Sequence, residues 1–293
     1  MPSLPLLDKR ITLTFTRDDG TTVVLPTPPT GRKPSIRLNG TFVAQLVVMH
    51  VDIRIWNFTS DLPLSSYKKV KVTAGYADDF HATISGVIMN SFRETPGPDG
   101  ITVFQMLVGL GEDWVTTTIN RTFPAGQTLD GVLRDVCSVL GLTLKNYADP
   151  TLALKVPIAW NGTAKNLLDK LSDLFKDYDA DSGAFIGLRM VPFGDDLIVY
   201  RGDQGTGVVH ELKYIAHAMH VGRGVDVQGP WIPTIRPGDT VKVDPKYFRQ
   251  DISGAASGTP GSLFNVFMLE FAFATDTDEN MMTLLTVGAS EAA

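Results

Sequence analysis

Hydrophobic and polar residues alternate along the first part of the chain with the period of a β-strand. Residues 51–55 read Val-Asp-Ile-Arg-Ile, and residues 69–72 read Lys-Val-Lys-Val. Such alternation is typical of strands that bury one face and expose the other. Two more runs of strand-forming residues, 84–89 and 101–108, flank a Thr-Pro-Gly-Pro-Asp-Gly turn. The pattern predicts that these two runs form a hairpin within a β domain over residues 1–125.

A second pattern, with apolar residues three or four positions apart, occupies the middle of the chain. It predicts one amphipathic helix over 128–140 and another over 164–178. Thr128 and Thr163 stand at N-cap positions, where a hydroxyl accepts a hydrogen bond from the first helical turn. Gly141 stands where a glycine ends the first helix. We expect the two apolar stripes to share one core.

Strand patterns return after the second helix. Residues 184–190 and 197–200 are predicted strands, joined by a Pro-Phe-Gly-Asp-Asp turn. Further along, residues 240–243 follow an Arg-Pro-Gly-Asp turn, and residues 263–274 are long enough for a full strand. The end of the chain is therefore predicted to be β again.

These elements divide the chain into a first β domain over 1–125, an α+β middle domain over 126–222 and a second β domain over 223–293. The predicted fold class is mainly β with an α+β insert that contains two helices. Charge is uneven, because the last of these domains has 5 basic and 9 acidic residues. After Arg249 there are six acidic residues and no basic one.

Composition excludes several classes of protein. The 293 residues carry a formal net charge of −6, which argues against stable nucleic-acid binding. The single cysteine cannot form an internal disulfide. No apolar run approaches the roughly 20 residues of a membrane-spanning helix, and no signal peptide is recognisable. We expect a soluble protein, either intracellular or carried on a particle.

Histidines and carboxylates give weak signals for a site. His210, His217 and His220 cluster, and the last two would share a face if their segment were helical. Zinc sites need three or four ligands, and no further spacing supports one. His81 follows Asp78 and Asp79, in a segment that favours a turn between strands over a general base. We therefore expect no metal site.

Motifs for nucleophiles and phosphate-binding loops do not occur in the sequence. Cys137 lies on the apolar side of the first predicted helix, where a thiol is usually inert. There is no Gly-x-Ser-x-Gly elbow and no Walker-type loop, and the Gly-x-Gly pairs at 109–111 and 222–224 lack the third glycine of a dinucleotide site. The sequence predicts a protein that is not an enzyme and holds no cofactor.

Six segments follow one another in a recognisable order: Ile53–Thr59, Tyr67–Tyr76, Ile84–Ile88, Thr128–Leu140, Thr163–Phe175 and Arg236–Val243. The first three contain a strand with an Ile-x-Asn-like end, a Val-x-Val-x-Ala-Gly-Tyr strand and a short x-Gly-x-Val strand. This order resembles that of bacteriophage tail baseplate hub proteins of the late control protein D group.

The resemblance implies two β-barrel-like tail-tube domains in each subunit. Three subunits would then present six similar units, so that a trimer joins a six-fold tail tube to a three-fold spike and lines the DNA channel. The implied partners are a second and third copy of the chain, a tail tube or tube-terminating protein, a separate spike or tip protein, and baseplate wedge or sheath-proximal proteins. The implied location is the tail baseplate of a virion, assembled in the host cytoplasm.

Two alternatives stay open at this point. The chain could be the hub or distal tail protein of a non-contractile phage or of a related injection apparatus. It could also be a tail-associated cell-wall hydrolase, which would need paired carboxylates or a metal in a concave site.

Two sets of residues are candidates for the hub's contacts. A Gly- and Ser-rich loop predicts a subunit contact; its candidate residues are Ser253, Gly254, Ser257, Gly258, Thr259 and Ser262. Acidic residues near the C-terminus are candidates for the wall of the DNA channel, since a negative wall gives phosphates no binding site. These residues are Glu270, Asp276, Asp278 and Glu279.

Overall fold

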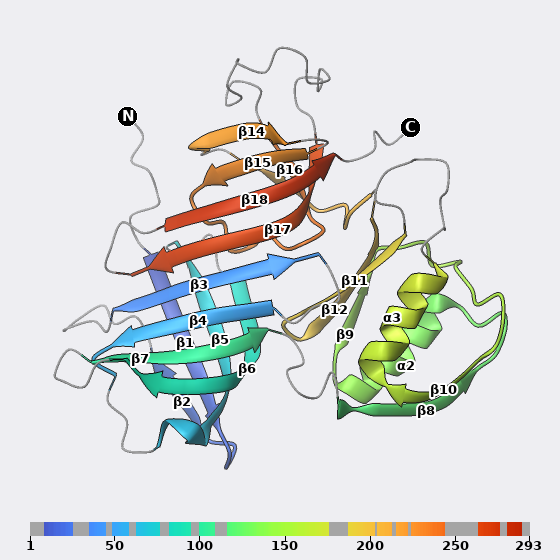
Figure 1. Ribbon diagram of the computed structural model, residues 1–293, viewed down its shortest axis with the longest axis horizontal. Coiled ribbons are helices and arrows are strands. Elements are labelled where there is room, and N and C mark those ends of the chain that lie inside the picture. The colour runs from blue at the N-terminus through green and yellow to red at the C-terminus, as the bar shows by residue number, and fades with distance from the viewer. Residues whose placement is uncertain are drawn as a thin grey trace.

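The computed structural model describes residues 9–25, 35–44, 49–58, 63–76, 82–94, 100–108, 116–175, 187–202, 204–212, 215–221, 224–243, 263–275 and 280–288. Strands dominate the described residues, and α2 (Leu129–Leu140) and α3 (Ala164–Leu174), from the middle of the chain, lie on one flank of the molecule (Figure 1). The predicted class, mainly β with an α+β insert, is confirmed.

One sheet of 13 strands contains most of the β-structure. Its N-terminal strands are β1 (Lys9–Arg17), β2 (Thr22–Leu25), β3 (Ile36–Val43), β4 (Met49–Trp56), β5 (Tyr67–Tyr76), β6 (Ala82–Arg93) and β7 (Ile101–Val108), with a short 3-10 turn, η2 (Leu64–Ser66), before β5. Its C-terminal strands are β13 (Val209–Glu211), β14 (His217–Val221), β15 (Gly224–Gly229), β16 (Thr240–Lys242), β17 (Leu263–Ala274) and β18 (Asn280–Gly288).

The strand order is β14-β15-β18-β17-β3-β4-β7-β6-β5-β1-β2, and β16 joins β13 to β17. In Figure 1 the strands from β14 to β7 lie one below the other, and β5 and β1 cross behind them, so the sheet curls. The expected hairpin of β6 and β7 is present, with an antiparallel register that shifts once, between Ile88 and Asn90. The proline-rich segment 26–34 and the turn 95–99 lie outside the described residues.

The β segments from the two ends of the chain meet at β3 and β17. These strands are antiparallel, and Leu38 lies opposite Phe273. A single hydrophobic core lies beneath both segments. Within this core the ring of Trp231 stacks on Phe271 with the centroids 4.4 Å apart. In the structure, the described strands of segments 1–125 and 223–293 share one sheet and one core. The division of these segments into two separate domains stays a prediction.

The helical unit consists of β8 (Thr118–Phe123), α2 (Leu129–Leu140), β9 (Thr143–Asn146), β10 (Ile158–Thr163), α3 (Ala164–Leu174), β11 (Leu188–Phe193) and β12 (Asp196–Arg201). The hydroxyls of Thr128 and Thr163 accept the predicted capping hydrogen bonds, and Gly141 ends α2 in the left-handed region with φ 68°. The predicted extension of α3 over 176–178 lies outside the described residues. The two apolar stripes share a second hydrophobic core, as expected.

The hairpin of β11 and β12 is buried on both faces and joins the two cores. Val191, Phe193, Ile198 and Tyr200 belong to the core of the large sheet. Their neighbours Leu188, Met190, Leu197 and Val199 belong to the core of the helices. Because successive side chains of a strand point to opposite faces, one hairpin can serve both cores. The helical unit is thereby packed directly against the sheet.

The turn of this hairpin is tighter than the sequence predicted. Pro192 lies inside β11, opposite Leu197, and the turn consists of Gly194 and Asp195 only. β11 is an edge strand of its three-stranded sheet and has a partner strand on one side only. Proline has no backbone N–H to donate, and an edge strand tolerates that loss. Gly194 has φ 61°, a conformation that glycine adopts without strain.

Candidate functional site

A buried carboxylate anchors the turn that leads into β16. Pro237 and Gly238 form the centre of this turn, and Gly238 has φ 91°, which fits the third position of a type II turn. Asp239 is 4% exposed. Its carboxylate accepts hydrogen bonds from the Thr206 hydroxyl at 2.6 Å and from the Arg236 backbone N–H at 3.0 Å. The same carboxylate lies 3.0 Å from Nε2 of His210.

The order of these groups does not suit nucleophilic catalysis. In an activated Ser or Thr, the imidazole lies between the hydroxyl and the carboxylate and takes the hydroxyl proton. Here the carboxylate lies in the middle, so that the Thr206 hydroxyl donates to Asp239 and not to His210. The cluster of Thr206, His210 and Asp239 therefore ties β13 to the turn before β16. We call it the Asp239 cluster.

The segment that contains His217 and His220 is a strand. Both histidines lie on β14, not on a helix. The condition for a shared helical face is therefore not met, because this segment pairs with β15 along its length. His81, Asp78 and Asp79 lie outside the described residues. Over the ranges that the structure describes, no three His, Cys, Asp or Glu side chains gather as metal ligands would.

Cys137 is buried in the helical core, as its place on the apolar stripe predicted. Burial raises the pKa of its thiol to about 11. The thiolate is the nucleophilic form, so this cysteine is inert at neutral pH. Burial also raises the pKa of the phenols of Tyr76 and Tyr200.

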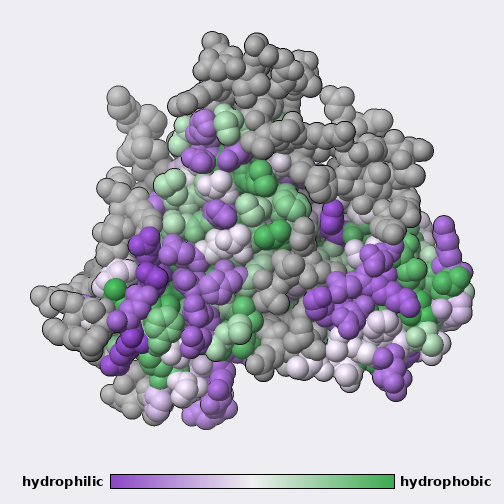
Figure 2. All heavy atoms as spheres, in the orientation of Figure 1, coloured by the Kyte–Doolittle hydropathy of each residue, from purple (hydrophilic) through white to green (hydrophobic). Residues whose placement is uncertain are grey.

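Figure 2 shows hydrophilic residues, with hydrophobic ones between them, on the outer face of the large sheet over β3, β4 and β7. Nε2 of His50 lies 3.1 Å from Oδ1 of Asp52, and the Gln105 amide donates to the same oxygen at 3.4 Å. Glu270 is exposed on β17, between Thr41 of β3 and Thr283 of β18. The structure thus places Glu270 among uncharged cross-strand neighbours.

Asp276, Asp278 and Glu279 lie outside the described residues, and so does the loop with Ser253, Gly254, Ser257, Gly258, Thr259 and Ser262. No helix in the described part of the chain has the length and hydropathy to cross a bilayer.

Sequence reasoning missed the Asp239 cluster for a simple reason. The Arg-Pro-Gly-Asp turn is recognisable, but Thr206 and His210 stand 33 and 29 residues before the aspartate that they contact. No spacing rule connects residues so far apart.

Neither a protein-family model nor a curated protein matches the sequence. Solved structures do match it. The 43 kDa tail protein of prophage MuSo2 from Shewanella oneidensis has a TM-score of 0.61 and 12% identity, and the match covers 96% of this chain and 98% of that chain. The chain has the fold of a tail protein.

Two further structures agree with this result. The tail protein from Neisseria meningitidis MC58 has a TM-score of 0.60 and 9% identity, and 96% of each chain is covered. The Escherichia coli c3393 protein has a TM-score of 0.56 and 13% identity, with 88% of this chain and 74% of that chain covered. It is described as a component of the type VI secretion system with structural similarity to the T4 bacteriophage tail proteins gp27 and gp5. At these identities the shared property is the fold.

Proposed function

We propose that this chain is the structural hub of a phage tail baseplate or of a related injection apparatus. The observation that carries the proposal is the length of the structural match, which covers 96% of this chain and 98% of a prophage tail protein. The match includes the large sheet and the helical unit together. A tail role for the chain therefore rests on the architecture of the whole subunit. The likeness to a type VI secretion component supports the wider description as an injection apparatus.

The proposed hub is a trimer that joins the tail tube to the spike. Each subunit contributes β strands from both ends of the chain, joined at β3 and β17. Three such subunits present six sets of strands, and closed rings of this kind are built from heterologous contacts between neighbours. The partners are a tube or tube-terminating protein on one side and a spike or tip protein on the other, with wedge or sheath-proximal proteins around the hub. The loop from Ser253 to Ser262 is the proposed subunit contact.

The proposed channel wall is acidic. The chain has a net charge of −6, and its segment after Arg249 contains six acidic residues and no basic one. Glu270 is exposed between threonines, and Asp276, Asp278 and Glu279 follow it in the sequence. Like charges around a narrow channel repel phosphates, so that a duplex passes without binding.

A cell-wall hydrolase is the less favoured function. The described residues contain a buried hydroxyl and a buried carboxylate beside a half-buried imidazole, but the carboxylate separates the other two groups. A role as a structural protein needs none of them to react.

The test is a cryo-electron microscopy reconstruction of particles purified through an affinity tag on this chain. The proposal expects three copies at the junction of tube and spike, with carboxylates on the channel wall. Six copies, a position away from the tail end, or a wall dominated by Lys and Arg would overturn it. Release of soluble fragments from purified peptidoglycan by the isolated chain would favour the hydrolase instead.

A further inference from the structure

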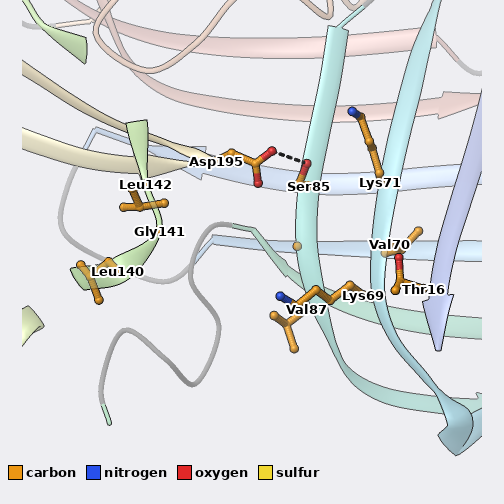
Figure 3. Close-up of a pocket in the computed structure, with 12 residues that line it drawn as sticks. Thr16, Lys69, Val70, Lys71, Ser85, Val87, Leu140, Gly141, Leu142 and Asp195 are labelled. Atoms are coloured by element: carbon orange, nitrogen blue, oxygen red, sulfur yellow. Dashed lines mark hydrogen bonds between the residues drawn. The ribbon is translucent and has the colours of Figure 1, made fainter. Parts of the chain in front are cut away.

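A groove of about 260 Å³ lies where the helical unit meets the large sheet. One wall is formed by β1, β5 and β6, and contains Thr16, Lys69, Lys71 and Ser85. The other wall is formed by residues 140–142 at the end of α2, together with the β11–β12 turn. Figure 3 shows the lysine side chains on the sheet side of this groove and Leu140, Leu142 and Asp195 across from them.

The two lysines project from the same face of β5. Val70 and Val72 point into the core, so Lys69 and Lys71 point outward, and both are exposed. Residues two apart on a strand are separated by about 7 Å. Neither lysine has an ion-pair partner among the described residues, whereas the neighbouring Lys68 lies 3.7 Å from Asp18. The groove therefore has two ammonium groups that the described residues do not neutralise.

The opposite wall leaves room beside the lysines. Gly141 and Gly194 both have positive φ and carry no side chain, and an added Cβ at Gly141 would meet nothing within 4 Å. The carboxylate of Asp195 accepts a hydrogen bond from the Ser85 hydroxyl at 3.4 Å and makes no ion pair with either lysine. The groove is open, and its helical wall combines the side chains of Leu140, Leu142 and Asp195 with the backbone of the two glycines.

We propose that this groove binds an extended acidic peptide segment from a neighbouring protein chain. An extended segment with carboxylates at every second position repeats at about 7 Å, which matches the spacing of Lys69 and Lys71. The Thr16 hydroxyl offers a further hydrogen bond along the same wall, whereas the Ser85 hydroxyl already donates to Asp195 and has only acceptor capacity left for a peptide N–H. A duplex is the poorer fit, because only two free lysines face the groove and the whole chain has a net charge of −6.

The origin of the acidic segment rests on the proposed function, since a hub is surrounded by other tail proteins. The binding of an acidic segment by the groove does not rest on the proposed function, because it depends only on residues of this chain. Single exposed ion pairs are weak. A segment held in an assembled particle binds at a high effective concentration, which makes a weak site useful there.

The experiment uses the full chain and a fluorescein-labelled peptide with aspartates at alternate positions, Ser-Asp-Thr-Asp-Thr-Asp-Ser. Fluorescence anisotropy at low salt should show binding that weakens as salt rises. The variant Lys69→Glu/Lys71→Glu should weaken binding at least tenfold and should instead bind the matching peptide with lysines in place of aspartates. The control variant Lys155→Glu/Lys170→Glu, with the same change in net charge on the helical unit, should bind the acidic peptide like the wild type.

Circular dichroism and thermal melting establish that each variant is folded, and Lys69→Gln/Lys71→Gln replaces the reversed pair if that pair fails to fold. Equal affinity of the wild type and the Lys69/Lys71 variants would overturn the proposal, as would equal binding of an Asn-for-Asp peptide. A duplex oligonucleotide that bound through the same lysines while the peptide did not would overturn it too. A reconstruction that places the chain outside a tail would contradict the hub and leave the peptide result unchanged, so the two failures are distinguishable.

Discussion

Replacement of Asp239 by alanine removes the acceptor at the centre of the Asp239 cluster. Three donors then lose their partner: the Thr206 hydroxyl at 2.6 Å, the Arg236 N–H at 3.0 Å and Nε2 of His210 at 3.0 Å. A buried polar group left without a partner costs about 1–3 kcal/mol. Thr206 is buried, whereas the His210 side chain is 18% exposed and regains some hydration. We expect Asp239→Ala to lower the free energy of unfolding by about 3–5 kcal/mol, a large part of the 5–15 kcal/mol typical of a domain.

Urea unfolding followed by circular dichroism measures this change. Asp239→Asn keeps one acceptor oxygen, so it should cost less than Asp239→Ala. In the background of Thr206→Val, the cost of Asp239→Ala should fall by about 1–2 kcal/mol, because the hydroxyl that would be stranded is already gone. A stability of Asp239→Ala within about 0.5 kcal/mol of the wild type, the range of ordinary surface changes, would refute the reasoning.

Three further changes have expected outcomes. Leu171 is fully buried in the helical core, so Leu171→Asp should cost several kcal/mol, about 3 or more, and lower the melting temperature sharply. Gly238→Ala should lower the urea midpoint, because a Cβ would lie 2.5 Å from the Tyr200 ring at a φ of 91°. Cys137 should react with iodoacetamide at pH 8 far more slowly in the folded chain than in urea, since its thiol has a pKa of about 11, with mass spectrometry as the readout.

Matched control variants show whether each effect comes from the stated mechanism or from a general sensitivity of the protein to substitution. Leu174 lies on the same helix but is 47% exposed, so Leu174→Asp should melt close to the wild type. Gly20 has a positive φ but no atom within 4 Å of an added Cβ, so Gly20→Ala should cost less than Gly238→Ala. A wild-type melting temperature for Leu171→Asp, equal costs for the two glycine changes, or equal alkylation rates in the folded and unfolded chain would contradict the respective argument.

Local signals in the sequence were sufficient for most individual elements. Thr128, Thr163 and Gly141 marked the helix ends correctly, because capping hydrogen bonds and the left-handed glycine depend on neighbours within a few residues. Runs of alternating residues located strands such as β4 and β5 for the same reason. The turn between β11 and β12 was placed too widely, because a proline is compatible with an edge strand, and the sequence does not show which strands are edges.

The sequence by itself determined where the strand-like alternation and the helical spacing of apolar residues occur, the helix caps and the acidic C-terminal segment. These features follow from the chemistry of adjacent residues. Only the tertiary structure decided that β3 joins β17 in one sheet, that the β11–β12 hairpin is buried between two cores, and that Asp239 meets Thr206 and His210. It also decided that Lys69 and Lys71 face the glycine turns of the helical unit. The physical reason is that packing brings together groups separated by dozens of residues, and a local pattern carries no record of such pairs.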